Sequence, residues 1–240
     1  EDDAIAVIDK PAGLVTHSNP RQRRGTVSDL AVARYGELPE VQGDDRPGIV
    51  HRLDRLTSGV MVLGRTQAAL ESLKAQFKAR TVAKKYLAVV HGTPRFDSEW
   101  LTGAIAPSVK SPDRMRVVAE HLEEELIEAG EARTASTLIE RIEDFGCASL
   151  VSAKPRTGRT HQIRVHLQHA RLPIVGDRVY GAKGALKNPL PAGAPRLERP
   201  ALHAHELSID HPSTGERLTF TSPPPADITA LLTALRPKSG

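Results

Sequence analysis

Several residue types and segments are scarce in this chain of 240 residues, and each scarcity excludes a class of protein. The single cysteine, Cys147, cannot form an intrachain disulfide or supply a cysteine-based zinc site, so we expect a reducing compartment such as the cytoplasm. No apolar run approaches the roughly 20 residues that span a membrane, so we expect no membrane partner. Aromatic residues make up only 3% of the chain, which argues against a surface that stacks rows of unpaired bases.

The charged residues that are present are segregated along the chain. The net charge of +4 is too small to identify a nucleic-acid partner by itself. One stretch is basic and another acidic: Lys154, Arg156, Arg159, Arg164, Arg171 and Arg178 against Glu120, Glu123, Glu124, Glu125, Glu128 and Glu131. Such segregation suits a basic face that binds phosphates, although two ordinary solvated faces would account for it equally well.

The hydrophobic pattern predicts strands and helices without a regular βαβ rhythm. The predicted strands are residues 4–9, 57–63, 86–91, 134–142, 147–153, 201–209 and 217–221. The predicted helices are residues 26–35, 66–79, 160–171 and 226–235, and the helix from residue 160 is expected to begin at a threonine cap. Residues 182–200, rich in proline, glycine and alanine, are expected to form a surface loop. This order favours an α+β fold with a mostly antiparallel sheet.

One carboxylate stands in an unusual setting. Asp54 lies between Arg52 and Arg55 and shortly before an apolar strand. Each neighbouring positive charge favours the ionised carboxylate. A carboxylate that stays ionised suits a nucleophile or an electrostatic stabiliser better than a proton donor. The same three residues would also fit a surface loop with a salt bridge.

The segment HRLDRLTSG, residues 51–59, resembles the catalytic signature of the RluA family of RNA pseudouridine synthases. Four further motifs resemble those of the family in the same order: DKPAGL at 9–14, KKYLAVVHG at 84–92, TGRTHQIRVHL at 157–167, and GD…YG at 176–181. The resemblance implies a bent, mixed sheet flanked by helices, with residues 1–240 forming a single catalytic domain. Many members carry a small S4-type RNA-binding domain, which would lie upstream of residue 1.

The resemblance also implies a reaction and its residues. The family isomerises uridine to pseudouridine in RNA, which requires no metal or other cofactor. Asp54 matches the nucleophile, which attacks either C1′ of the sugar or C6 of the base. Arg164 matches the arginine that pairs with this aspartate, and Tyr86 matches the tyrosine against the target base. Arg52 matches a residue that fills the space left by a flipped nucleotide. Three further residues are expected to contact the substrate: Lys10, Arg159 and Thr160.

Other interpretations are less well supported. The histidines invite a metal site, but their spacing matches no zinc motif and no cysteine pair supports them: His161, His166, His169, His203 and His205. A glycoside hydrolase would need a second carboxyl group beside Asp54, and no such motif stands out. A non-catalytic RNA-binding module would not explain a carboxylate inside a basic segment. An inactive family member is disfavoured because the three predicted catalytic residues are present.

The target RNA is less well defined than the reaction. We expect large-subunit ribosomal RNA as the substrate, with transfer RNA as the alternative. The protein is expected to be a monomer, since no long apolar surface helix is left over.

Overall fold

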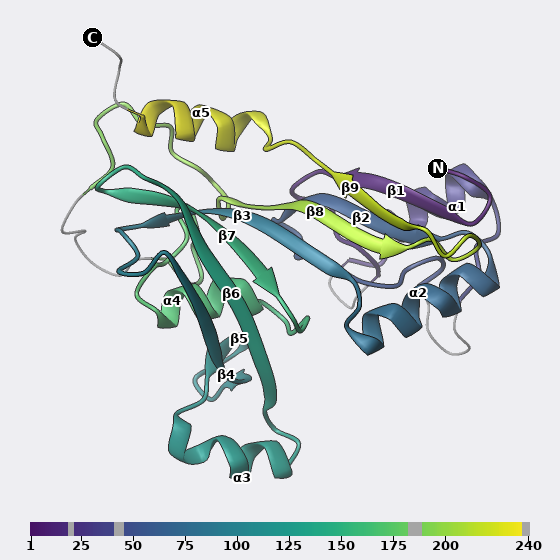
Figure 1. Ribbon diagram of the computed structural model, residues 1–240, viewed down its shortest axis with the longest axis horizontal. Helices are drawn as coiled ribbons and strands as arrows, with labels where there is room; N and C mark the ends of the chain where they lie inside the picture. Colours follow the sequence, from purple (N-terminus) through teal and green to yellow (C-terminus); the bar gives the residue numbers. More distant parts are fainter. Residues whose placement is uncertain (19–21, 41–45, 182–188, 237–240) are drawn as a thin grey trace. The chain divides into compact units, whose positions relative to one another are not determined.

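The computed structural model describes residues 1–18, 22–40, 46–181 and 189–236. The chain divides into two compact units, Glu1–Lys84 with Ala204–Pro223 and Lys85–His203 with Pro224–Gly240, so it passes from one to the other after Lys84, His203 and Pro223. The strand pairings described within these units are antiparallel, and each unit also contains helices (Figure 1). This confirms the expected α+β class. The expectation of a single catalytic domain stays a prediction.

The first unit contains four strands and two helices among its described residues: β1 (Ile5–Lys10), β2 (Ser58–Gly64), β8 (Leu202–Asp210), β9 (Arg217–Thr221), α1 (Val27–Tyr35) and α2 (Gln67–Ala79). Their order is β1-β2-β8, with β9 paired to β8, which confirms the predicted hairpin. Helix α2 begins after Thr66, whose hydroxyl accepts a hydrogen bond from Ala69 N. Its apolar face packs on β2 through Ala69 and Leu73.

The second unit is built on five antiparallel strands in the order β3-β7-β6-β4-β5: β3 (Ala83–His91), β4 (Ser98–Ser108), β5 (Ser111–Val117), β6 (Arg133–Asp144) and β7 (Ala148–Pro155). Its helices are α3 (Glu123–Glu128), α4 (Gln162–His169) and α5 (Ala226–Leu235), with a short 3₁₀ turn, η1 (Glu120–Leu122), before α3. The apolar side chains of α4 and α5 pack into the same core as those of β3 and β7. Strand β3 thereby places Tyr86 at the edge of this core.

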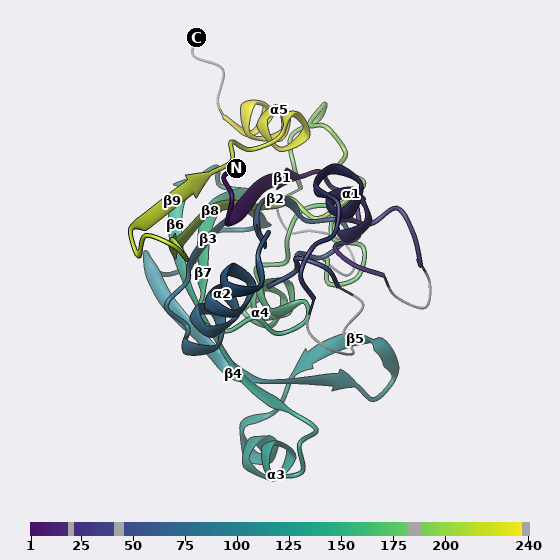
Figure 2. The same ribbon diagram turned by 90° about the vertical axis from the view of Figure 1, so that its right-hand side faces the viewer.

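Three elements of the second unit were not predicted. Strands β4 and β5 and helix α3 arise where the hydrophobic pattern is weak, because β4 contains Gly103 and Pro107 and β5 is mostly polar. Pairing with β6 supplies the hydrogen bonds that make β4 a strand. Helix α3 carries much of the acidic block at one end of the strands (Figure 2). It is held there by a small apolar cluster and by the carboxylate of Glu123, which accepts a hydrogen bond from Ala104 N.

The predicted start of α4 was wrong. The helix begins at Gln162 rather than Thr160, and the residue before it, His161, has a left-handed backbone (φ 56°) without a side-chain cap. The side chain of Gln162 instead holds the segment before the helix, since its Oε1 accepts hydrogen bonds from Arg159 N (3.0 Å) and Thr157 Oγ1 (2.7 Å). Thr160 therefore does not act as the expected N-cap, and the helix starts without a side-chain cap.

The loop that follows α4 is only partly at the surface. Residues 182–188 of the predicted loop lie outside the described residues, but Leu197, Arg199 and Pro200 are buried. Arg199 binds Asp227 of α5 through Nε and Nη2, both at 2.7 Å, which anchors this end of the loop. None of the described helices has the length and apolar character needed to cross a membrane.

Gly59 of β2 lies where no side chain fits. A Cβ atom at this position would lie 2.2 Å from the carbonyl oxygen of Ala204 in β8, and the backbone of Gly59 has φ +121°. Close approach of β2 and β8 therefore depends on glycine.

We predict that Gly59→Ala destabilises the protein by about 3 kcal/mol, because the methyl group pushes the strands apart and strains the backbone. Urea denaturation followed by circular dichroism measures the loss. Gly158→Ala is the control, since Gly158 has open space around its Cβ position and no left-handed backbone. Equal stability of the two variants would contradict the steric explanation.

Candidate active site

The loop that carries Asp54 has little regular structure. It leads into β2, with Leu53 buried, Asp54 partly buried, and Arg52 and Arg55 exposed. The amide of Thr57 donates a hydrogen bond to the carbonyl of Asp54 (3.0 Å), which closes a turn directly after the carboxylate. Exposure of Arg52 is compatible with its predicted place beside a substrate.

A segment near the N-terminus holds this loop from both sides of Asp54. The buried hydroxyl of Thr16 donates to Leu53 O (3.0 Å) and accepts from Leu53 N (3.3 Å). The amide of Gly13 donates to Arg55 O (2.7 Å). Because both neighbours of Asp54 are tied to residues 13–16, the position of its backbone is well defined.

Lys10 completes this attachment. Its side chain is fully buried, and its ammonium group donates to three backbone carbonyls: Pro11 O (2.9 Å), Leu14 O (2.9 Å) and Arg55 O (3.2 Å). The positive charge thus joins the 11–14 turn to the loop of Asp54 within the first unit. These contacts indicate a structural role, while the substrate contact expected for Lys10 stays a prediction.

His51 supports the loop from its N-terminal side. Its Nε2 accepts a hydrogen bond from Val62 N (3.1 Å), and its ring stacks on Phe77 with 4.6 Å between centroids. Burial, together with the positive charge of Lys84, lowers the pKa of His51 to about 3. The imidazole is therefore neutral at ordinary pH and serves as an acceptor in the structure.

The second unit carries the other predicted residues. Tyr86 is partly buried in β3, opposite Ala153 of β7. Immediately before α4, Thr160 is exposed and Arg159 is partly buried, with its Nε donating to Thr134 O (3.2 Å). The contacts of Arg159 within the protein also fit a structural role, and its substrate contact stays a prediction.

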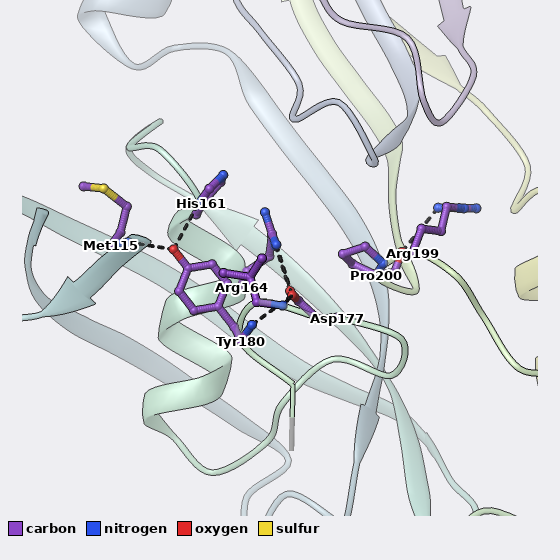
Figure 3. A network of polar contacts seen from close by, with 8 residues as sticks. Met115, His161, Arg164, Asp177, Tyr180, Arg199 and Pro200 are labelled. Carbon is purple, nitrogen blue, oxygen red and sulfur yellow. Dashed lines mark hydrogen bonds and ion pairs between the residues drawn. The ribbon is translucent and has the colours of Figure 1, made fainter. Parts of the chain in front are cut away.

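Arg164 is buried on α4 in an ion pair that the sequence reasoning missed. Its Nε lies 2.7 Å from Asp177 Oδ2 and its Nη2 lies 3.0 Å from Asp177 Oδ1 (Figure 3). Burial raises the pKa of Asp177, but the hydrogen bonds and the charge of Arg164 lower it by more. The pKa of Asp177 therefore lies below its usual value. Asp177 belongs to the GD…YG motif, for which the family resemblance implies no role.

The structure therefore groups the predicted residues within two units. Lys10, Arg52 and Asp54 belong to the first unit, where Lys10 contacts the loop of the other two. The others belong to the second unit: Tyr86, Arg159, Thr160 and Arg164. The predicted pairing of Asp54 with Arg164 joins residues of different units and stays a prediction.

Comparisons with known proteins identify the class. The family described as RNA pseudouridylate synthase matches residues 4–169. The ribosomal large subunit pseudouridine synthase D of Xanthomonas campestris is 40% identical over 250 residues, covering 100% of this chain and 69% of that protein. An uncharacterized RNA pseudouridine synthase of Chloroflexus aurantiacus is 42% identical over 232 residues, covering 96% and 66%. The chain thus spans about two thirds of the length of such relatives.

A solved structure agrees with these relatives. Human RNA pseudouridylate synthase domain containing 4 superposes with a TM-score of 0.71 at 26% identity, covering 98% of this chain and 91% of that one. The chain belongs to the RluA family of RNA pseudouridine synthases. Its activity is accordingly that of an isomerase, and its substrate is RNA.

We predict that Lys10→Met lowers stability by about 1–3 kcal/mol, because the hydrogen bonds from the buried ammonium group to three backbone carbonyls are lost. The catalytic rate constant should fall as well, with little change in KM for RNA, since Arg55 is next to Asp54. Thermal denaturation and steady-state kinetics measure the two effects, with Lys78→Met at an exposed position of α2 as the control. A rise in KM with an unchanged rate constant would instead support a substrate contact for Lys10.

We predict that His51 makes the protein sensitive to acid. Its pKa is about 3 when folded and near 6.5 when unfolded, so the unfolded chain binds the extra proton between these values. Stability conferred by neutral His51 is complete above pH 6.5 and is lost as pH falls towards 3. His51→Gln keeps an acceptor for Val62 N without titrating. The drop in unfolding free energy from pH 7 to pH 5 should therefore be smaller in His51→Gln, and an identical drop would contradict this role.

Proposed function

We propose that this protein converts uridine to pseudouridine in large-subunit ribosomal RNA, with Asp54 as the nucleophile and the target base extruded from its helix. The proposed target RNA is supported by the relatives named ribosomal large subunit pseudouridine synthase D. Those of Xanthomonas campestris and Neisseria meningitidis cover 100% of this chain at 40% and 38% identity. Transfer RNA is the alternative substrate.

Asp54 suits a nucleophile because its backbone is fixed while its neighbours are basic. The hydrogen bonds of Thr16 and Gly13 hold the residues on either side of it. Its neighbours Arg52 and Arg55 are exposed cations on the same loop. An ionised and positioned carboxylate can attack C1′ of the sugar or C6 of the uracil, and the two routes differ in the bond that breaks first. Fixing the nucleophile in advance removes part of the entropic cost of attack.

Extrusion of the base gives the nucleophile access to the target uridine, which is otherwise stacked in its helix. Removing a base from its stack costs a few kcal/mol. Arg52 is exposed on the same loop as Asp54, and its flat cation would fill the vacated space and offset part of this cost. We assign Tyr86 to a position against the extruded uracil, where a phenol can both stack and hydrogen-bond.

The remaining residues orient the reactants. Arg164 would pair with Asp54 and hold its carboxylate in the direction of attack, since a guanidinium binds a carboxylate in a defined geometry. Arg159 and Thr160 would contact the RNA backbone or base beside α4, and Lys10 would hold the loop of Asp54 within the first unit. We further expect the protein to act as a monomer in a reducing compartment such as the cytoplasm, without a metal ion.

We predict that Asp54→Asn binds RNA but does not isomerise it. Large-subunit ribosomal RNA transcripts with tritium at uridine C5 report the reaction, because the C5 proton is released to water when the base is rejoined through C5. The wild-type protein should release tritium and Asp54→Asn should not, at equal RNA affinity in a filter-binding assay. Asp3→Asn removes an exposed carboxylate and should behave like the wild type. Turnover by Asp54→Asn would disprove the assignment of the nucleophile.

The same assay distinguishes the substrates. Release from ribosomal but not from transfer RNA transcripts would support the proposed target, and the reverse would favour the alternative. Binding to both without release from either would favour a non-catalytic RNA-binding protein.

A further inference from the structure

The GD…YG motif forms a tight loop around one carboxylate. A Cβ atom on Gly176 would lie 2.2 Å from Arg199 O, and one on Gly181 would lie 2.0 Å from Asp177 O. Both glycines are therefore required by the close packing of the loop. The loop encloses Asp177, whose side chain has no exposed surface.

The two oxygens of Asp177 have different partners. Oδ1 accepts hydrogen bonds from the backbone amides of Val179 (2.9 Å) and Tyr180 (3.0 Å) and from Nη2 of Arg164. Oδ2 accepts from Nε of Arg164 at 2.7 Å. Oδ1 thus stabilises the turn and Oδ2 contacts only the guanidinium among the hydrogen bonds described. The carboxylate also compensates a buried positive charge, which would otherwise be strongly unfavourable.

Tyr180 supports the same pair from a second side. Its ring centroid lies 5.0 Å from Cζ of Arg164. Its hydroxyl accepts a hydrogen bond from Met115 N of β5 (2.7 Å) and shares another with Nδ1 of His161 (2.9 Å), the residue before α4 (Figure 3). The ring is therefore held by both β5 and the start of α4.

We propose that Asp177, supported by Tyr180, is a positioning residue for pseudouridine formation: it fixes the plane of the Arg164 guanidinium. A bidentate contact along the Nε–Nη2 edge determines the orientation of the whole planar group. Any carboxylate that Arg164 binds is then held in a direction set by Asp177. This inference rests on the proposed role of Arg164 as the partner of Asp54.

Asp177→Asn tests the proposal while keeping the backbone hydrogen bonds of the turn. The asparagine oxygen can keep both backbone hydrogen bonds, while its NH₂ group replaces the acceptor of Arg164 Nε with a donor. We expect the catalytic rate constant to fall on the order of 10- to 100-fold with KM for RNA unchanged, because misplacement by about 1 Å is costly to catalysis. Tritium release from ribosomal RNA transcripts measures both constants.

Asp227→Asn is a matched control. Asp227 binds Arg199 through the same atoms, with 2.7 Å from Nε to Oδ2 and from Nη2 to Oδ1, and it accepts a backbone hydrogen bond from Ile228 N. The substitution should lower the melting temperature without changing the rate constant. Equal losses of rate in Asp177→Asn and Asp227→Asn would show that Asp177 acts only through stability and would overturn the proposal.

Arg164→Ala separates this inference from the proposed function. Loss of activity in Arg164→Ala with full activity in Asp177→Asn would overturn the inference and leave the function intact. Full activity in Arg164→Ala would overturn both the role of Arg164 and the inference. If Asp177→Asn does not fold, Tyr180→Phe carries the test, since it removes only the hydroxyl. A several-fold fall in rate at constant KM would support the proposal, and an unchanged rate would overturn it.

Discussion

Compensation of buried charge is the constraint on which both units depend. In the first unit, the ammonium of Lys10 is enclosed by backbone carbonyls, and this contact joins the 11–14 turn to the loop of Asp54. In the second, the guanidinium of Arg164 is compensated by Asp177 within a closed loop. Removing one member of such a contact leaves a charge or a polar group without a partner, at a cost well above that of an ordinary hydrogen bond. Charges held in this way provide fixed points around which irregular segments can be ordered.

The parts of the fold that could be predicted are those with a local periodic signal. Helices α2 and α5 have apolar residues at helical spacing, and β8 and β9 are joined by a turn that favours a hairpin. Strands β4 and β5 could not be predicted because their conformation depends on pairing with β6 and with each other rather than on their own pattern. Helix α3 lies within a run of glutamates, and its apolar contacts are with residues of other elements.

The candidate site shows the same division. Asp54, Tyr86 and Arg164 could be predicted because family motifs contain them. Thr16 could not, since its function appears only when the chain brings it to Leu53, 37 residues away. Asp177 belongs to a family motif, but its ion pair with a residue 13 positions earlier follows from the loop closure that Gly176 and Gly181 permit. Residues that react can thus be recognised from short patterns, whereas residues that hold them in place require the folded chain.

The division of the chain into units also bears on its synthesis. The first unit includes Glu1–Lys84, but strands β8 and β9 of that unit come largely from Ala204–Pro223. When residues 1–84 leave the ribosome, β2 lacks its neighbour β8, and its backbone groups on that side have no partner strand. The first unit is therefore completed only after residues 85–203 of the second unit have been made. Until residue 223 has emerged, the segment carrying Asp54 has an open strand edge that must be kept from pairing with other chains.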